Sequence, residues 1–331
     1  MRTLKSLCIL AFLLTVLLLQ LSFNFDPHLP IKTSNTSAES QSSFKVNQTV
    51  LKKACKQKSL YLKQEVFRKN FENWLLIHSK YKIAYCHLAK VGSTAWKTIL
   101  IRLVSDQEMQ EKLLQMDTNE LHSAINPIFS SKNVDASHQK LSKFLFMEKY
   151  FTFVFVRHPL DRLVSAYIDK VLNTKNTYYA YVRKALLQKY SEVNFQNFLR
   201  FVLNSMEKCN SQTTTCLNSI DVHWQPYYQR CEFCDVKYDY IGRLETFNHD
   251  VQEVLIQANM TEYIPIQKIK QIHQSTTMST SQLQIDVDGI QASEFTKQYF
   301  KNVEESVVKK IFQYFELDFL LFQYSVNGIL N

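Results

Sequence analysis

Lysine, glycine and hydroxyl side chains occur together in the segment Cys86–Leu100, CHLAKVGSTAWKTIL. A loop that leads into a helix leaves backbone N–H groups unpaired and directs the positive end of the helix dipole at a bound group. Gly92, one of only 4 Gly in the chain, permits close approach, Ser93 and Thr94 add hydroxyl donors, and Lys90 adds a positive charge. The segment therefore predicts a site for a phosphate-like anion. The alternative is an ordinary turn with a Ser or Thr cap; a Walker A loop is excluded because G-x-x-x-x-G-K-[ST] is absent.

A second candidate site lies in FVRHPLDRLVSAYIDK, which begins at Phe155. Arg157 precedes a helix start, and Arg162 and Ser165 follow one and two turns later. A guanidinium is a planar fork that suits a phosphate, so this turn predicts a second anion site. The alternative is that Arg157 forms a structural ion pair with one of the two aspartates that follow it, Asp161 or Asp169.

These residues need strands and helices that position them. KIAYCHL reads as a short strand before the first loop, and the apolar run Phe151–Val156 reads as a parallel strand covered on both faces. A helix is expected from Pro159, and its predicted inward stripe consists of Leu160, Leu163, Val164, Tyr167 and Val171. Its predicted polar side consists of Asp161, Arg162, Ser165 and Asp169. Two strand-to-helix turns predict an α/β fold, a P-loop-like parallel sheet flanked by helices, with ligand at the carboxyl ends of the strands.

Composition limits the class of protein. With 46% hydrophobic and 13% aromatic residues the chain is expected to fold into a large packed domain, and disorder is excluded for most of it. The 39 Lys+Arg against 30 Asp+Glu give a formal charge of +9, which favours anionic partners. Charge alone does not choose among nucleic acid, phospholipid, nucleotide and acidic polysaccharide.

The N-terminal part predicts export. Residues 6–25 carry no charge and are long enough to span a bilayer, and the basic residues before them place residues 1–5 in the cytosol. A cleaved signal peptide is the alternative, disfavoured because no small-residue cleavage site follows. Residues 26–70 are expected to form a luminal stem and residues 71–331 the folded domain. Sequons at Asn35, Asn47 and Asn259 agree with a luminal location.

Six cysteines remain besides Cys8 in the predicted anchor. The pair Cys231 and Cys234, with Cys209 and Cys216 upstream, has a zinc site as an alternative, but an oxidising lumen and the spacing favour disulfides. Cys55 and Cys86 are a further candidate pair. The connectivity is not readable from the sequence.

Four segments in order resemble the Golgi carbohydrate sulfotransferases, especially the branch of chondroitin/dermatan 4-O-sulfotransferases and glucuronyl 3-O-sulfotransferases. AKVGSTAWK and FVRHPLDRLVSAYIDK resemble the family's 5′-phosphosulfate and 3′-phosphate loops. HWQPYYQRCEFCDVKYDYIGRLETFNHD and the terminal YFELDFLLFQY resemble its later motifs, so the resemblance covers about Cys86 to Tyr324. Three positions depart from the usual wording: Ala89 replaces Pro, Ala95 replaces Asn, and Phe233 replaces the Pro of C-x-P-C.

The resemblance implies transfer of a sulfonyl group from 3′-phosphoadenosine 5′-phosphosulfate to a sugar hydroxyl, without a metal. It implies that Lys90 also stabilises charge on the leaving phosphate, and that Arg157 and Ser165 hold the 3′-phosphate. The residues expected to bind the donor are Ala89, Lys90, Val91, Gly92, Ser93, Thr94, Ala95, Lys97, Arg157, Arg162 and Ser165.

The base that takes the acceptor proton is expected to be a histidine or carboxylate poised near neutral pH. His138, before the second strand, ranks first because a related heparan-type family places its catalytic histidine about there. His223 heads the H-W motif and is the next candidate, while His158 adjoins the 3′-phosphate site and is expected to lie too far from the sulfur.

The sequence thus predicts a type II Golgi membrane protein that sulfates an anionic glycan and does not act on nucleic acid. Position 4 of GalNAc in chondroitin or dermatan is the first choice of acceptor and position 3 of glucuronic acid the second. A glycan-binding homologue without activity is an alternative, motivated by Ala89 and Ala95. A luminal nucleotide kinase on a P-loop-like fold is disfavoured by the missing Walker A residues.

Overall fold

The computed structural model describes residues 48–58, 71–134, 141–209, 219–234, 236–264, 285–286 and 289–330. The predicted cytoplasmic tail and membrane anchor, and most of the predicted stem, lie outside these ranges. Within them, no helix combines the length and the apolar character that crossing a bilayer requires.

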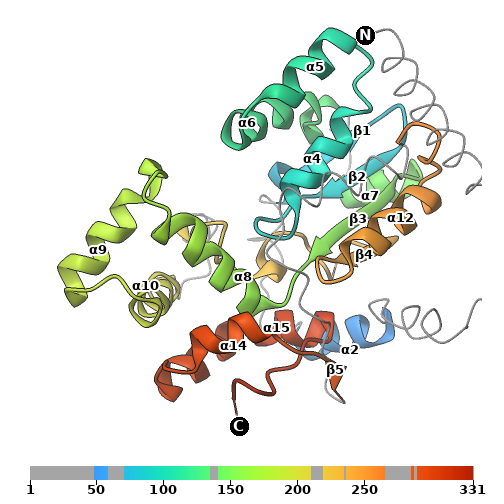
Figure 1. Ribbon diagram of the computed structural model, residues 1–331. Helices are drawn as coiled ribbons and strands as arrows, with labels where there is room; N and C mark the ends of the chain where they lie inside the picture. Colours follow the sequence, from blue (N-terminus) through green and yellow to red (C-terminus); the bar gives the residue numbers. More distant parts are fainter. Residues whose placement is uncertain are drawn as a thin grey trace, which may run out of the picture. The chain divides into compact units, whose positions relative to one another are not determined.

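The elements are arranged as Figure 1 shows. The strands are β1 (Leu75–His78), β2 (Ile83–Cys86), β3 (Phe151–Val156), β4 (Tyr240–Arg243), β5 (Ile285–Asp286) and β6 (Gly289–Ile290). The α-helices are α2 (Gln48–Lys58), α4 (Ser93–Ile101), α5 (Gln107–Gln115), α6 (Thr118–Ile128), α7 (Leu141–Met147), α8 (Pro159–Ala166), α9 (Ala180–Tyr190), α10 (Phe195–Glu207), α12 (Phe247–Gln257), α14 (Glu294–Phe300) and α15 (Glu305–Phe322). Short 3-10 helices are η2 (Glu72–Trp74), η3 (Ser131–Asn133), η5 (Thr177–Tyr179) and η6 (Tyr227–Gln229), and η4 (Tyr167–Leu172) is a π-helix.

The central sheet has four strands in the order β1-β2-β3-β4. β1 runs antiparallel to β2, whereas β2, β3 and β4 are parallel, with Ile83 opposite Phe151 and Phe153 opposite Tyr240. Five of the six residues of β3 are buried, as expected of a central strand covered on both faces. The predicted strand Phe151–Val156 is therefore confirmed to the residue, and the carboxyl ends of β2 and β3 meet at one edge of the sheet.

Helices cover both faces of this sheet. α4 and α12 both pack on the face that carries Phe153 and Phe155, since Tyr240, opposite Phe153, donates to Asp250 of α12. On the other face, which carries Val156 and Arg243, Arg243 Nη2 donates to the carbonyl of Phe322 in α15 at 2.8 Å. Trp96 of α4 packs on Phe153 and Phe155 of β3, with ring centroids 4.6 and 5.1 Å apart, and Phe247 at the start of α12 contacts Phe155 at 5.5 Å. The predicted architecture, a parallel sheet flanked by helices, is confirmed, with β1 as an added antiparallel edge.

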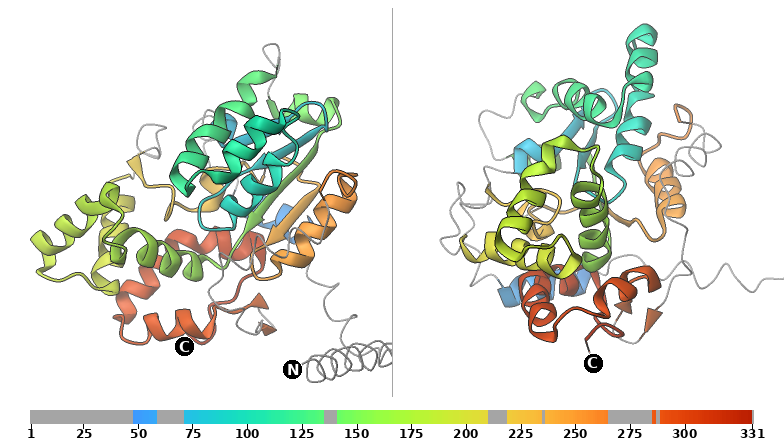
Figure 2. Two further views of the ribbon diagram at one scale, coloured as in Figure 1. Left: turned by 45° about the horizontal axis from the view of Figure 1, so that its top comes forward. Right: turned by 60° about the vertical axis from the view of Figure 1, so that its left-hand side comes forward.

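A second group of helices lies beyond the carboxyl ends of β3 and β4 and packs together (Figure 2). It consists of α8, η4, α9, α10, α14 and α15. α15 packs against α2, α8 and α10. α8 begins with His158 as its N-cap and Pro159 in its first turn, as predicted. The predicted inward stripe of α8 and η4 is buried at every position: Leu160, Leu163, Val164, Tyr167 and Val171.

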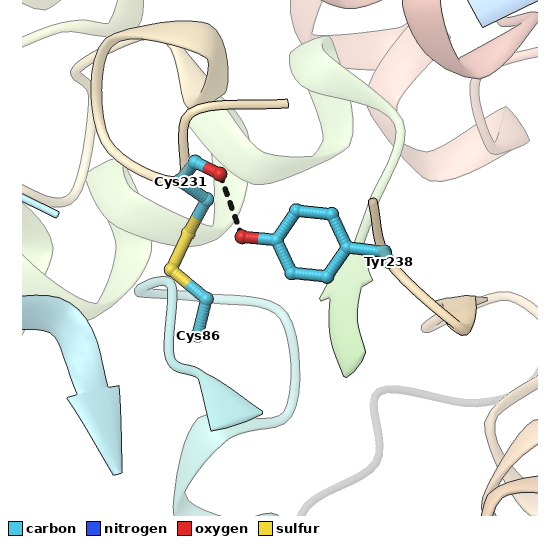
Figure 3. Close-up of a disulfide and its surroundings, with 3 residues drawn as sticks. All are labelled: Cys86, Cys231 and Tyr238. Carbon is cyan, nitrogen blue, oxygen red and sulfur yellow. Dashed lines mark hydrogen bonds between the residues drawn. A yellow bond between two sulfur atoms is a disulfide. The ribbon is translucent and has the colours of Figure 1, made fainter. Parts of the chain in front are cut away.

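Two disulfides hold the C-x-x-C segment. Cys86, the last residue of β2, is bonded to Cys231, whose carbonyl accepts a hydrogen bond from the buried Tyr238 hydroxyl at 2.6 Å (Figure 3). Cys234 is bonded to Cys55 of α2, a helix within the range predicted as stem. The candidate pairing of Cys55 with Cys86 is therefore wrong, and so is the zinc alternative, because the sulfurs of both C-x-x-C residues are oxidised.

Candidate functional site

The first predicted loop connects β2 to α4 and has an unusual backbone. Lys90 and Gly92 have φ values of 68° and 84°, both in the left-handed region. A Cβ atom on Gly92 would lie 2.8 Å from Phe247 Cε2 and 3.1 Å from Leu244 Cδ1. Glycine is thus required at position 92 both for its conformation and because the loop passes closely over the β4–α12 connection.

The start of α4 presents free N–H groups at this loop. The first backbone bond of the helix runs from the Trp96 N–H to the Gly92 carbonyl, at 3.0 Å. Among the described residues, nothing accepts from the N–H groups of Ser93, Thr94 and Ala95. These groups, with the positive end of the helix dipole, can bind an anion. Val91 is fully buried, so it would contribute backbone only.

Lys90 connects the two predicted anion sites. Its Nζ lies 2.8 Å from Asp169 Oδ2, and the same oxygen is 3.1 Å from Lys170 Nζ. Burial lowers the pKa of Lys90, and Asp169 opposes that shift. Burial raises the pKa of Asp169, but the two lysines outweigh it and hold that pKa below its usual value. The ammonium of Lys90 is therefore held against the end of the α8–η4 helix.

Arg157 follows β3 and has a fixed backbone and an unengaged guanidinium. Its N–H donates to the Tyr227 hydroxyl at 3.3 Å, and that hydroxyl donates to the Arg157 carbonyl at 3.1 Å. In the part of the chain that the structure describes, the Arg157 guanidinium makes no hydrogen bond or ion pair, and neither does the hydroxyl of half-buried Ser165. Both side chains can thus serve a ligand.

The alternative role of Arg157 is wrong, since both aspartates have other partners. Asp169 pairs with the two lysines described above. Asp161 accepts hydrogen bonds from the backbone N–H and the hydroxyl of Ser293, at 3.1 and 3.0 Å.

The expected polar side of α8 is wrong at two positions. Asp161 and Arg162 are 5% and 1% exposed. Nε, Nη1 and Nη2 of Arg162 donate to the carbonyls of Ala89, Gln225 and Val222 at 3.0, 2.6 and 2.6 Å. All three nitrogens are engaged, and they link the loop to the H-W-Q-P segment. The geometry therefore favours a structural role for Arg162 over the predicted contact with the donor.

The ammonium of Lys97 is engaged by α6. Lys97 is 1% exposed, and its Nζ lies 2.6 Å from His122 Nδ1 and 2.9 Å from Asn126 Oδ1, both on α6. Burial lowers the pKa of Lys97 to about 7 and that of His122 to about 4. His122 Nε2 is 3.2 Å from the Thr94 hydroxyl. With His122 neutral and its proton on Nε2, Thr94 would accept that hydrogen bond and keep its own proton for a ligand.

His223 belongs to a hydrogen-bonded group with a carboxylate and a phenol. Its Nδ1 lies 2.7 Å from Asp221 Oδ1 and 2.9 Å from the Tyr179 hydroxyl, which donates to Asp221 Oδ2 at 2.9 Å. Burial lowers the pKa of His223, and Asp221 opposes this. In the described ranges, Nε2 has no partner. An imidazole oriented by a carboxylate at Nδ1 is suited to take a proton at Nε2.

A model of the sulfotransferase family matches residues 73–325. The chain belongs to the sulfotransferase family. It is 25% identical over 283 residues to carbohydrate sulfotransferase 11 of Rattus norvegicus, a match that covers 81% of this chain and 72% of the relative. Carbohydrate sulfotransferase 9 of Homo sapiens is 26% identical over 263 residues, 76% of this chain and 53% of the relative. Carbohydrate sulfotransferase 10 of Rattus norvegicus is 25% identical over 294 residues, with 85% and 75% covered.

No solved structure matches the chain. The resemblance predicted from the four motifs is confirmed. This sulfotransferase is an enzyme of the class that uses 3′-phosphoadenosine 5′-phosphosulfate as donor. In the described ranges, no three His, Cys, Asp or Glu side chains are grouped as metal ligands would be.

The later motifs of this sulfotransferase brace the Arg157 turn. Asp318 accepts from the N–H groups of Tyr227 and Tyr228 at 2.7 and 3.1 Å, and Tyr227 holds the Arg157 backbone. Glu245 accepts from the His158 N–H at 2.6 Å and from the Tyr324 hydroxyl at 3.1 Å. The four segments of the sequence resemblance are thus one connected structure.

Two histidine predictions have different outcomes. His158 is fully buried, its Nε2 is 2.9 Å from the Ser325 carbonyl, and its Nδ1 accepts from the Leu160 N–H, so it has a structural role. His138, the first-ranked base, lies outside the described residues.

Sequence reasoning missed His122. The signal was present in NELHSAIN, where His122 and Asn126 are four residues apart and so share a helix face. That face meets Lys97, which the same reasoning assigned to the donor.

The departures at positions 89, 95 and 233 fit the structure. Ala89 contributes its carbonyl to Arg162, and Ala95 is 4% exposed, within the packed start of α4. The Phe233 ring fills the core against Phe322, at a centroid distance of 4.7 Å.

Proposed function

We propose that this enzyme transfers the sulfonyl group of 3′-phosphoadenosine 5′-phosphosulfate to a hydroxyl of an anionic glycan. The names of its relatives support a carbohydrate acceptor. The first acceptor we propose is position 4 of GalNAc in chondroitin or dermatan, and the second is position 3 of glucuronic acid. We also propose that the enzyme is a type II Golgi membrane protein, anchored by residues 6–25, that acts in the lumen and not on nucleic acid.

The observation that carries the proposal is the position of Lys90, Arg157 and Ser165 around two helix starts at one sheet edge. Lys90 and the N–H groups of Ser93 and Thr94 would hold the 5′-phosphosulfate. Arg157 and Ser165, which have no other partner among the described side chains, would hold the 3′-phosphate. Transfer in this class depends on positioning and on preformed stabilisation of charge, as phosphoryl transfer does.

His223 is our candidate for the base, in place of His138. Its Nε2 would take the proton of the acceptor hydroxyl while that oxygen forms a bond to sulfur. The bond from sulfur to the 5′-phosphate oxygen breaks, and Lys90 with the loop N–H groups stabilises the charge that develops on the phosphate. Asp221 fixes the imidazole so that Nε2 is free.

Sulfate transfer from radiolabelled donor by the secreted part of the chain, Asp26–Asn331, tests the function. Desulfated chondroitin, desulfated dermatan and an oligosaccharide ending in glucuronic acid would be compared in parallel. Lys90→Ala and Arg157→Ala should each reduce transfer at least about a hundredfold, because each removes a charge that positions or stabilises the donor.

Lys82→Ala and Arg200→Ala are matched controls, because these side chains form surface ion pairs with Glu148 and Glu304. Transfer at the wild-type rate by Lys90→Ala or Arg157→Ala would refute the site. Donor binding without transfer to any glycan would instead support the glycan-binding homologue without activity.

A further inference from the structure

Arg230 is a buried cation without an acidic partner. It is 4% exposed, and its guanidinium lies over the Trp74 ring at 3.9 Å. In the described part of the chain no atom accepts a hydrogen bond from this guanidinium and no carboxylate pairs with it, and its Nε is enclosed without a partner. Arg162, equally buried, has every nitrogen bonded to a carbonyl. Leaving a buried charge unpaired is costly, so Arg230 is better explained by a ligand than by the fold.

The disulfide between Cys86 and Cys231 places Arg230 beside the loop between β2 and α4, called the donor loop because we propose that it holds the 5′-phosphosulfate. In the sequence Arg230 directly precedes Cys231, and His87 directly follows Cys86. Trp74 contacts both residues: its ring centroid is 5.4 Å from that of the His87 ring, and the Arg230 guanidinium stacks on the Trp74 ring. His87 Nε2 is a second buried polar atom without a partner. The Arg230 guanidinium and His87 Nε2, both without a partner among the described residues, therefore lie against Trp74, each in a residue next to a cysteine of the disulfide.

Arg230 is also near the candidate base. Its pKa is lowered to about 9 by burial and by Arg162, and Asp221, the partner of His223, opposes this shift. Arg230 therefore remains protonated at neutral pH. The charge of Arg230 in turn contributes to the low pKa of His87, which burial chiefly lowers. A positive group is thus available that neighbours the donor loop and interacts with the partner of His223, whereas Lys90 and Arg157 already account for the anionic groups of the donor in the proposed function.

We propose that Arg230 binds the carboxylate of a hexuronic acid in the acceptor, on or next to the sugar that is sulfated. The proposal rests on the function proposed above and adds how the acidic acceptor is recognised. A guanidinium presents parallel N–H groups that match a carboxylate, and its stacking on Trp74 fixes its plane. His87 Nε2 offers a neutral polar partner beside it. A sulfate ester already present on the glycan has similar chemistry and is distinguished in the experiment.

The test compares Arg230→Gln with wild type on two polymers: desulfated chondroitin, and the same polymer with its carboxyl groups reduced to alcohols. We expect Arg230→Gln to lower kcat/KM about tenfold to a hundredfold on the carboxylate polymer, the range of a charged hydrogen bond. On the reduced polymer the variant should match wild type, and KM for the donor should stay unchanged. Arg200→Gln is the matched control, an arginine in a surface ion pair.

Arg230→Lys keeps the charge but not the planar fork, so it should retain only part of the preference for the carboxylate polymer. It also serves if Arg230→Gln is not secreted, and thermal unfolding of each variant checks its folding. An equal loss on both polymers would show a structural role and overturn the proposal. A raised KM for the donor would assign Arg230 to the donor and overturn it as well.

A carboxyl-reduced polymer that carries sulfate esters separates the two anions. If Arg230→Gln loses activity on this polymer as much as on the carboxylate polymer, selection of a carboxylate is refuted. If wild type labels no glycan, the proposed function has failed. Binding of polyuronic acid to wild type and to Arg230→Gln then tests the subsite alone, and equal affinities would refute it.

Discussion

A histidine that accepts a proton must be neutral at the start of each turnover, and burial favours the neutral form of His223. We therefore expect kcat to rise with pH along a limb that lies below 6.5, the usual pKa of histidine, and then to level off. His223→Ala should lower the plateau by about a hundredfold to ten-thousandfold and remove this limb. The measurement is kcat against pH at saturating donor and acceptor.

Asp221→Asn tests whether the Asp221 carboxylate raises the pKa of His223. The Asp221 carboxylate raises the pKa of His223, so its removal should move the acid limb to lower pH while the plateau falls through loss of orientation. A limb that persists in His223→Ala would show that another group, such as His138, is the base. A limb that moves to higher pH in Asp221→Asn would contradict the assigned interaction.

Individual residues also show what pattern reasoning can predict. Arg157 directly follows one predicted strand, and Lys90 and Gly92 lie in the short loop after the other, so their place at the sheet edge was predictable from the chain alone. Arg162 and Lys97 were not, because the partners that bury them, the carbonyls of Gln225 and Val222 and the side chain of His122, come from distant segments.

At the scale of elements, the β2–α4 loop depends on Gly92. Gly92→Ala would place a methyl group against Phe247 and force a left-handed conformation that costs an alanine about 1–2 kcal/mol. The loop N–H groups would shift, so we expect KM for the donor to rise at least about tenfold, the cost of a loop displaced by about an ångström or less. Transfer kinetics at varied donor concentration check this.

Gly328→Ala is the matched control for Gly92→Ala. Gly328 has a φ of 81°, and its added Cβ would meet only the flexible Lys297 side chain at 3.0 Å. The backbone cost is thus similar, but the site is outside the donor loop. An unchanged donor KM in Gly92→Ala, or an equal rise in both variants, would contradict the role given to this loop.

Strands and helices were predictable where the hydrophobic pattern agrees with residues that mark the start or end of an element. β3 is an unbroken apolar run, and Pro159 marks the start of α8. The two faces of α8 were only half predictable, since Ser293 and the H-W-Q-P segment cover the side that its polar residues suggest is exposed. The spacing of apolar and polar residues shows that the two faces of a helix differ, but it does not show that both faces are buried.

At the scale of the molecule, two disulfides link β2 and α2 to the C-x-x-C segment across 145 and 179 residues respectively. Closing a loop of that length in the unfolded chain stabilises the fold by up to about 5 kcal/mol in chain-entropy models. The double variant Cys86→Ser, Cys231→Ser should therefore unfold at a lower temperature and bind the donor product more weakly. Thermal unfolding and product binding are the measurements.

The double variant Cys55→Ser, Cys234→Ser is the comparison. It removes a bridge that joins α2 to the same segment but does not touch the donor loop. We expect a loss of stability with donor binding retained once the protein is folded. Equal effects of the two double variants on product binding would contradict a specific link between the Cys86 bridge and the site. No spacing rule could have predicted this connectivity, because it is decided by which segments the sheet brings together.

The same bridges set an order of events during synthesis. Lys90 and Gly92 are made early, but Cys86 must wait for Cys231, and Arg157 must wait for Tyr227, which fixes its backbone. A nascent chain that has not reached the C-x-x-C segment therefore carries the strand, the loop and the helix without a fixed donor site. We therefore expect catalytic competence to arise late in translation, and the bond between Cys86 and Cys231 to form in a compartment that oxidises thiols.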